Sequence, residues 1–169
     1  SVYCNGAQHI RLSKDTIAVA LRGEYSWLGE EESMNIAHMA NGSYLSALRV
    51  MSENEDNQTY FDDFVALMRN AWLVGQKKDY SALLKLRQWS MEMADSKVGR
   101  EKQKAFLQYA QRQLRENYIY NFGCSEMNYQ TEKEKGFSTR FAPFIHEGNV
   151  EKMMEEFGKA EQQIGQNGN

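Results

Sequence analysis

The three histidines have the widest choice of chemistry in this sequence, since histidine can bind a metal ion or move a proton near neutral pH. They are His9, His38 and His146, and they fall in three different segments. Metal sites on one helix face need a partner at a spacing such as Glu-x-x-His or His-x-x-x-His. None of the three has such a partner, so we expect exposed or hydrogen-bonded histidines and no metal ion.

A run of carboxylates, Glu30, Glu31 and Glu32, is the next candidate for chemistry. A carboxylate can act as a general acid or base when it folds against a second acid in a cleft. This run follows Gly29 at an expected helix start, where negative charge complements the helix dipole. We therefore assign it a structural role.

Sequence motifs of enzymes that bind nucleotides or form acyl intermediates do not occur. The sequence contains no Gly-x-x-x-x-Gly-Lys-Ser/Thr, no Gly-x-Gly-x-x-Gly and no Gly-x-Ser-x-Gly. It therefore predicts no active site, no cofactor and no small-molecule substrate.

Two groups of cations could contact a polyanion or another protein. One is Lys77-Lys78, and the other lies on an expected helix over residues 100–121. The cations of that helix that we select are Arg100, Lys104, Arg112 and Arg115. Glu101 and Glu116 interrupt them, which favours a solvated or partner-facing surface over a nucleic-acid site.

Trp72 and Trp89 lie at helical spacing among apolar residues, which is typical of core positions. The other possibility is that one of them anchors an interface, where tryptophan is enriched. We therefore add Trp72 to the four cations as a candidate interface.

Composition predicts an all-α protein of the cytosol. Pro143 is the single proline among many helix-forming residues. The net charge of −3 and pI near 5.7 argue against a dedicated nucleic-acid binding site.

Cys4 and Cys124 form no disulfide framework, which fits a reducing compartment. No apolar run approaches the ~18 residues of a membrane span, so no membrane partner is expected.

Helix signals divide the chain into two modules. Three short helices, over about 14–23, 30–40 and 43–52, make a first module of residues 1–53, in which 1–12 form a poorly defined lead-in. Glu53 to Gln58 is acidic and free of apolar residues, so 54–58 is the expected linker. A larger module, 59–169, follows, with helices expected at about 59–74, 79–94, 100–121 and 149–164, and with Pro143 limiting helix in 137–145.

The joint between the second and third helices carries a resemblance. Asn41-Gly42 is a good helix C-terminus, and Ser43 can cap the helix that follows. Gly42, Ser43, Leu45, Ala47 and Leu48 resemble the Gly-Ser-x-Arg-x-Ala-Leu motif in the lid of AAA+ ATPases. In active members the arginine reaches the nucleotide phosphates, and here Leu45 occupies its position. A leucine cannot donate to a phosphate, so the resemblance implies a lid whose nucleotide sensor is lost.

The second module is similar to one clamp-loader family. Residues 99–107 and 114–117 look like the collar signature of δ′ subunits of the bacterial DNA polymerase III clamp loader. Residues 127–129 and 137–145 are similar to δ′ chains of the Bacteroidota. The resemblance runs in order through lid, acidic linker and collar. It implies a fragment that lacks the N-terminal ATPase-like domain of the family and that ends before the further apolar helix usual in the family.

This resemblance also implies a function. The chain would be a non-hydrolysing subunit that helps hold a five-membered ring of δ, γ/τ and δ′ together while the ring places the sliding clamp on primed DNA. The ATPase and polymerase activities would lie in other subunits of this cytoplasmic, nucleoid-associated replisome. No cofactor is implied.

Three alternatives stay open. A γ/τ-type subunit is the first, and an arginine at position 45 would have favoured it. The second is a DNA-binding helix-turn-helix, whose recognition helix over 43–52 would carry only Arg49 as a cation. The third is a helical-bundle enzyme, which needs a buried cluster of acids or histidines.

Overall fold

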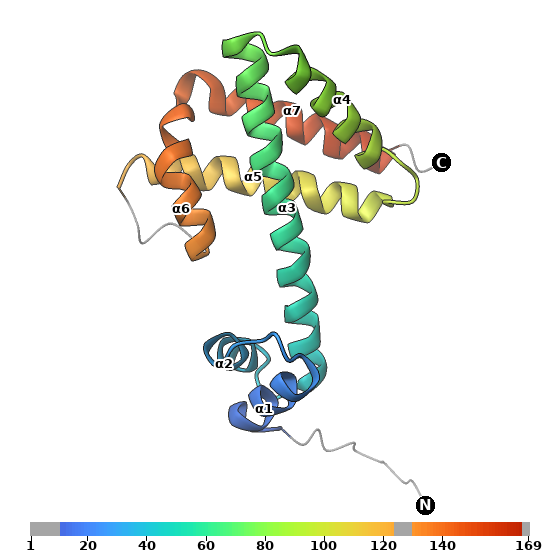
Figure 1. The fold of residues 1–169 in the computed structure, drawn as a ribbon, viewed down its shortest axis with the longest axis vertical. Coiled ribbons are helices and arrows are strands. Elements are labelled where there is room, and N and C mark those ends of the chain that lie inside the picture. The colour runs from blue at the N-terminus through green and yellow to red at the C-terminus, as the bar shows by residue number, and fades with distance from the viewer. Residues whose placement is uncertain (1–10, 124–129, 167–169) are drawn as a thin grey trace, which may run out of the picture. The chain divides into compact units, whose positions relative to one another are not determined.

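The computed structural model describes residues 11–123 and 130–166, and every element in these ranges is helical (Figure 1). The elements are α1 (Lys14–Glu24), α2 (Glu30–Met39), α3 (Tyr44–Lys77), α4 (Tyr80–Met93), α5 (Arg100–Tyr120), α6 (Glu132–Phe141), the 3₁₀ turn η2 (Ala142–Phe144) and α7 (Glu147–Gln166). The predicted all-α class is confirmed for the described residues. The chain divides into two compact units, Ser1–Gln58 and Thr59–Asn169.

The first unit has a small core built where α1 and α2 pack together and the start of α3 joins them. Its fully buried apolar side chains are Ile17, Ala18, Leu21, Ala37 and Ala47. α1 begins where expected, because the Ser13 hydroxyl accepts a hydrogen bond from the Thr16 amide at 3.1 Å.

One helix limit predicted from the sequence is wrong. The expected break in helix at Glu53 to Gln58 does not occur, since these residues are helical within α3. All of them are exposed, so this part of the helix is not stabilised by burial of apolar side chains. Propagation of a helix adds one hydrogen bond for each residue fixed, and Glu and Gln are good helix formers. The division between the two units falls inside α3, and the assignment of the units as lid and collar stays a prediction.

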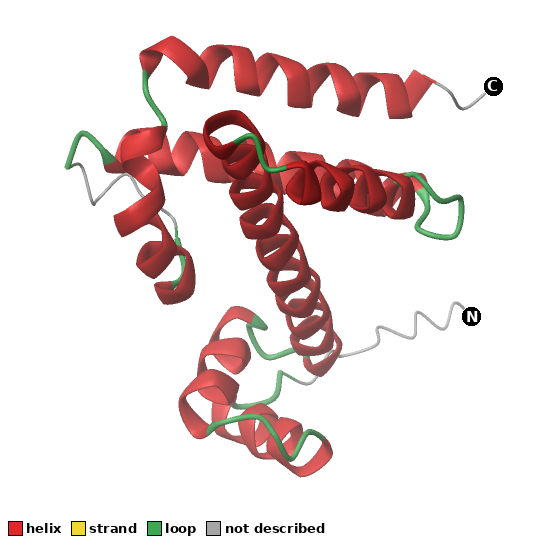
Figure 2. Cartoon of the chain, turned by 45° about the horizontal axis from the view of Figure 1, so that its top comes forward, coloured by secondary structure: helices red, strands yellow, loops and turns green. Residues whose placement is uncertain are grey.

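The second unit is built on α5. Its core contains the buried side chains Phe61, Phe64, Phe106, Tyr109, Ala110, Leu114 and Ile145. α5 and α7 pack closely and lie side by side in both views (Figures 1 and 2). The ring of Phe137 on α6 meets those of Phe61 and Phe64 edge-on, with centroids 5.8 and 6.2 Å apart. Aromatic contacts of this kind add to burial in holding the helices together.

The sequence analysis did not anticipate that α6 begins at Glu132. A capping box starts this helix: the Thr131 hydroxyl accepts from the Glu134 amide at 3.3 Å, and the Glu134 carboxylate accepts from the Thr131 amide at 3.0 Å. Pro143 lies after α6, in η2, and so limits this helix as expected.

We expect the stability of α3 within residues 53–58, where the two units meet in the sequence, to determine where a protease cuts first. In Asn57→Pro, the proline removes a backbone donor and clashes with the preceding turn, at a cost of about 3 kcal/mol to the helix. Limited proteolysis should then cleave this variant within 53–58 before any other site. The matched control is Asn57→Ala, which strengthens the helix and should be cut there more slowly than wild type. First cleavage of all three proteins inside 61–72 would contradict this account.

Candidate functional site

The corner between α2 and α3 has the backbone that the sequence predicted. Asn41 and Gly42 both have left-handed backbone, with φ of 49° and 86°. The Ser43 hydroxyl accepts a hydrogen bond from the Ser46 amide at 3.3 Å, which satisfies one of the free donors at the start of α3. The positive φ of Gly42 favours glycine, and a Cβ there would also approach the Cβ of Arg11 closely, at 3.1 Å.

The other motif residues divide into buried and exposed ones. Ala47 is completely buried, and Leu48 packs against the core of the first unit. Leu45 is 77% exposed. The first turn of α3 therefore presents an apolar side chain to solvent.

Polar contacts beside the corner are local. The Tyr44 hydroxyl donates to the Glu24 carboxylate, and this hydrogen bond raises the pKa of Tyr44 to about 12. The Lys14 ammonium lies 2.6 Å from Nδ1 of His38. At the other end of the chain, the Gly148 amide donates to Nδ1 of His146 at 3.1 Å. Both histidines are exposed and hydrogen-bonded as expected, while His9, Cys4 and Cys124 lie outside the described residues.

The four cations selected on α5 have different surroundings. Arg100 is exposed in the first turn, whereas Lys104 is half-buried on the side of α7. Gln108 and Gln111 donate to the Glu161 carboxylate of α7 at 2.7 and 2.9 Å. These hydrogen bonds, and more weakly the charge of Lys104, lower the pKa of Glu161. The two glutamine side chains thus connect α5 to α7, and the charge of Lys104 acts on the same carboxylate.

Arg112 and Arg115 also have carboxylates near them. The Arg112 guanidinium is 3.5 Å from Glu134 and stacks over the Tyr109 ring at 5.0 Å, and that of Arg115 is 3.7 Å from Glu116. The structure therefore does not leave the four cations as one free basic surface. Whether their exposed parts also contact another protein stays a prediction.

The two tryptophans differ in environment. Trp89 packs in the core of the second unit, with its ring centroid 5.2 Å from that of Phe106, as the sequence predicted. Trp72 is partly exposed, and the Lys77 ammonium lies 5.7 Å from its ring. Trp72 keeps its place as a candidate interface residue.

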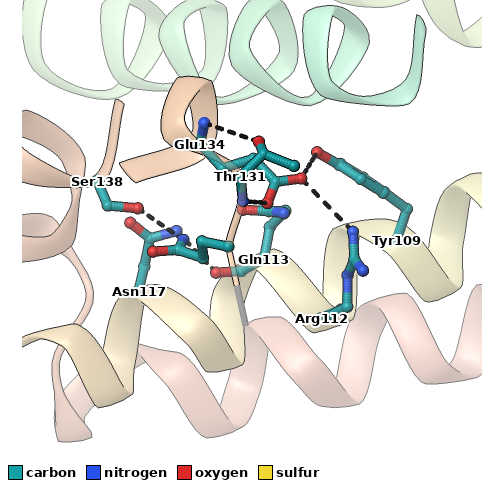
Figure 3. Close-up of polar contacts among 8 residues, drawn as sticks. Tyr109, Arg112, Gln113, Asn117, Thr131, Glu134 and Ser138 are labelled. Carbon is teal, nitrogen blue, oxygen red and sulfur yellow. Dashed lines mark hydrogen bonds and ion pairs between the residues drawn. The ribbon is translucent and has the colours of Figure 1, made fainter. Parts of the chain in front are cut away.

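A buried polar network between α5 and α6 was missed by the sequence analysis (Figure 3). Glu134 is its centre: besides its capping contacts, it accepts from the Tyr109 hydroxyl at 2.8 Å and pairs with Arg112. Burial, followed by this hydrogen bond, raises the pKa of Tyr109. Because the Glu134 carboxylate is already engaged by these donors, the network serves to hold α6 on α5. The Thr131-x-x-Glu134 spacing was the signal that could have revealed it.

Two amides of α5 lie next to this network and are completely buried. The Asn117 side chain donates to the Gln113 carbonyl at 2.7 Å, and Gln130 donates to the Ser138 hydroxyl nearby at 2.8 Å. Within the described residues, both amide atoms of Gln113 and the side-chain oxygen of Asn117 have no partner. A buried polar group left in this state costs about 1–3 kcal/mol.

Comparisons with known proteins give no match to a family model, a curated protein or a solved structure. Over the described residues, no group of three or more histidine, cysteine and acidic side chains is placed to hold a metal ion. None of the helices described is both long enough and apolar enough to cross a bilayer.

Replacement of Gly42 should weaken the first unit. Gly42→Ala puts a side chain on left-handed backbone, which costs about 1–2 kcal/mol, and crowds Arg11. The control is Gly23→Ala in α1, where an added Cβ meets nothing within 4 Å and the helix gains about 0.5 kcal/mol. Hydrogen exchange of α1 and α2 should be faster in the first variant and unchanged or slower in the second. Equal exchange in the two variants would show that the corner does not depend on glycine.

Charge reversal should destabilise the protein at Arg112 but not at Arg100. Arg112→Glu places a second carboxylate beside buried Glu134 and should lower the free energy of unfolding by about 2 kcal/mol. Arg100→Glu changes an exposed charge and should stay within about 0.5 kcal/mol of wild type. Urea unfolding followed by circular dichroism measures both values. Equal stability of the two variants would mean that the Glu134 network does not support the fold.

Proposed function

We propose that this chain is the lid and collar part of a non-hydrolysing δ′-type subunit of a bacterial clamp loader. One observation carries the proposal. Leu45 occupies the position of the motif arginine, is exposed at the first turn of α3, and lies on a corner whose other motif residues keep their structural roles. This is the pattern of a lid that keeps its architecture without its contact to nucleotide.

The loss of that contact has a chemical meaning. Phosphoryl transfer depends on cations and hydrogen-bond donors fixed around the phosphate oxygens, and a leucine supplies neither. The described residues also contain no cluster of three or more histidine, cysteine and acidic side chains placed to hold a metal ion. A subunit with this lid is suited to assembly of the ring, while its neighbours hydrolyse ATP.

The alternatives have less support. The recognition helix of a helix-turn-helix would be the first part of the 34-residue helix α3, and Arg49 would be its only cation over residues 43–52. The buried acids Glu116 and Glu134 both pair with arginines on α5, which is a structural use rather than that of an enzyme site. A γ/τ-type subunit would need a cation where Leu45 lies.

Assembly tests the proposal. The chain, co-expressed with the γ/τ and δ subunits encoded in the same genome, should co-purify with at least one of them in the absence of ATP and DNA. A protein containing the complete lid and collar that binds neither subunit would contradict the proposal.

Nucleotide chemistry gives a separate test. The full-length protein that contains these residues, purified without γ/τ, should not hydrolyse ATP, and Leu45→Arg should not create hydrolysis, because one cation cannot replace a phosphate loop and its metal ion. The turnover of radiolabelled ATP is the measurement. Hydrolysis by the wild-type protein alone would favour a γ/τ-type subunit.

A further inference from the structure

Helix α4 has a stripe of large apolar side chains that nothing in the described part of the second unit covers. Tyr80, Leu84 and Met91 are 79%, 66% and 65% exposed, and Leu83 beside them is 48% exposed. Positions i, i+4 and i+11 lie on one face of a helix. Single exposed apolar residues are ordinary, but four of them on one face of a helix of 14 residues form a patch typical of interaction sites.

The stripe is separate from the face of α4 that packs inside the unit. Ala82 is almost completely buried, and Trp89 and Met93 pack against the core. The side-chain amide of Gln103 on α5 donates to the Met93 carbonyl at 2.8 Å and fixes this end of α4. The helix is thus held through one apolar face and presents a second one to solvent.

We propose that the α4 stripe, Tyr80, Leu83, Leu84 and Met91, is the docking surface for an amphipathic helix of a partner protein that has acidic residues along its edges. The proposed function is the basis for naming that partner as a neighbouring clamp-loader subunit. The spacing on α4 is that of two helices packed along a shared seam, and tyrosine, methionine and arginine are enriched at such contacts.

The charges around the stripe favour an acidic partner. Arg87 lies on the same helix face as Leu84 and Met91, and Lys77, Lys78 and Lys85 are exposed nearby in sequence. Over the described chain, neither Lys85 nor Arg87 has a carboxylate within 4.0 Å. Cations beside an apolar seam select a helix whose flanking residues carry the opposite charge.

The acids of this segment are already engaged. The Asp79 carboxylate accepts from the Ser81 hydroxyl and from the amides of Ser81 and Ala82 at the start of α4, and these hydrogen bonds lower the pKa of Asp79. The Glu92 carboxylate accepts from Gln88 at 2.8 Å. Neither of these carboxylates lies within 4.0 Å of Lys85 or Arg87, so both cations can form ion pairs with acidic residues of a partner.

A second copy of this chain fits the stripe less well than an acidic helix does. Two-fold pairing of α4 with itself would bring the Arg87 side chains and the neighbouring lysines of both copies to one interface, and like charges there disfavour association.

Two peptides and four variants test the inference. The first probe is a synthetic helical peptide with leucine at heptad positions a and d and glutamate at e and g, and the second has lysine at e and g. Full-length chain should bind the glutamate peptide at least about tenfold more tightly than the lysine peptide in fluorescence anisotropy. Leu84→Glu and Met91→Glu should each weaken this binding by about tenfold or more, and the milder Leu84→Ala by less.

The control is Val19→Glu, which introduces the same charge at an exposed apolar position of α1 and should leave binding unchanged. Circular dichroism should show wild-type helix content in all four variants, because the replaced side chains are exposed. The same variants are then co-purified with the γ/τ and δ subunits, where the stripe variants should lose binding and Val19→Glu should keep it.

The outcomes show separately whether the docking surface and the clamp-loader proposal are right. If a subunit binds all variants as tightly as wild type, the docking surface is wrong and the proposed function stands. If no subunit binds but the glutamate peptide does, with the expected loss in the stripe variants, the docking surface stands and the clamp-loader proposal fails. Equal binding of the two peptides, or binding of neither, overturns the inference. So does a stripe-dependent dimer in sedimentation, or stripe-dependent binding to phosphatidylglycerol vesicles in place of the peptide.

Discussion

The second unit depends on the burial of α5. Seven residues of this helix are buried, more than in any other described helix, and three of them, Gln113, Glu116 and Asn117, are polar. A helix enclosed to this extent must satisfy its polar groups inside the protein, because water does not reach them. The Glu134 network with α6 meets that requirement in part. Among the residues that the structure describes, the side-chain amide of Gln113 has no partner and marks where the requirement is not met.

Enclosure of α5 also decides which surfaces remain for other molecules. Its cations look available in the sequence, but Arg112 pairs with the Glu134 carboxylate of α6, and Lys104 is half-buried. On α4, the large apolar side chains of Tyr80, Leu83, Leu84 and Met91 are exposed, because the core contact of this helix uses only its other face. A unit that buries α5 and exposes an apolar face of α4 is suited to assembly with other proteins, which is the role that we propose for it.

The presence of the helices could be predicted from the sequence. Some of their ends, and the burial of polar residues on α5, could not. Ser13, Gly42 and Ser43 act locally, so their effects on α1 and the corner follow from residue type alone. The 53–58 segment is helical because helices on both sides extend into it, which composition does not reveal. Gln113 and Asn117 share a helix face with apolar neighbours, and only the position of α6 shows that this face is buried. Likewise, the exposure of Leu45 and of the α4 stripe depends on which faces the other helices cover.

We propose that this chain is a ring subunit that keeps the lid without its nucleotide contact. Electron cryomicroscopy of the complex reconstituted from the full-length protein with γ/τ, δ and an ATP analogue tests it most directly. The account predicts that the chain occupies one position of the ring, with residues 59–169 contacting a neighbour and no nucleotide phosphate within hydrogen-bonding distance of the first turn of α3. A ring assembled without this chain, or a nucleotide phosphate bound at the start of α3, would contradict it.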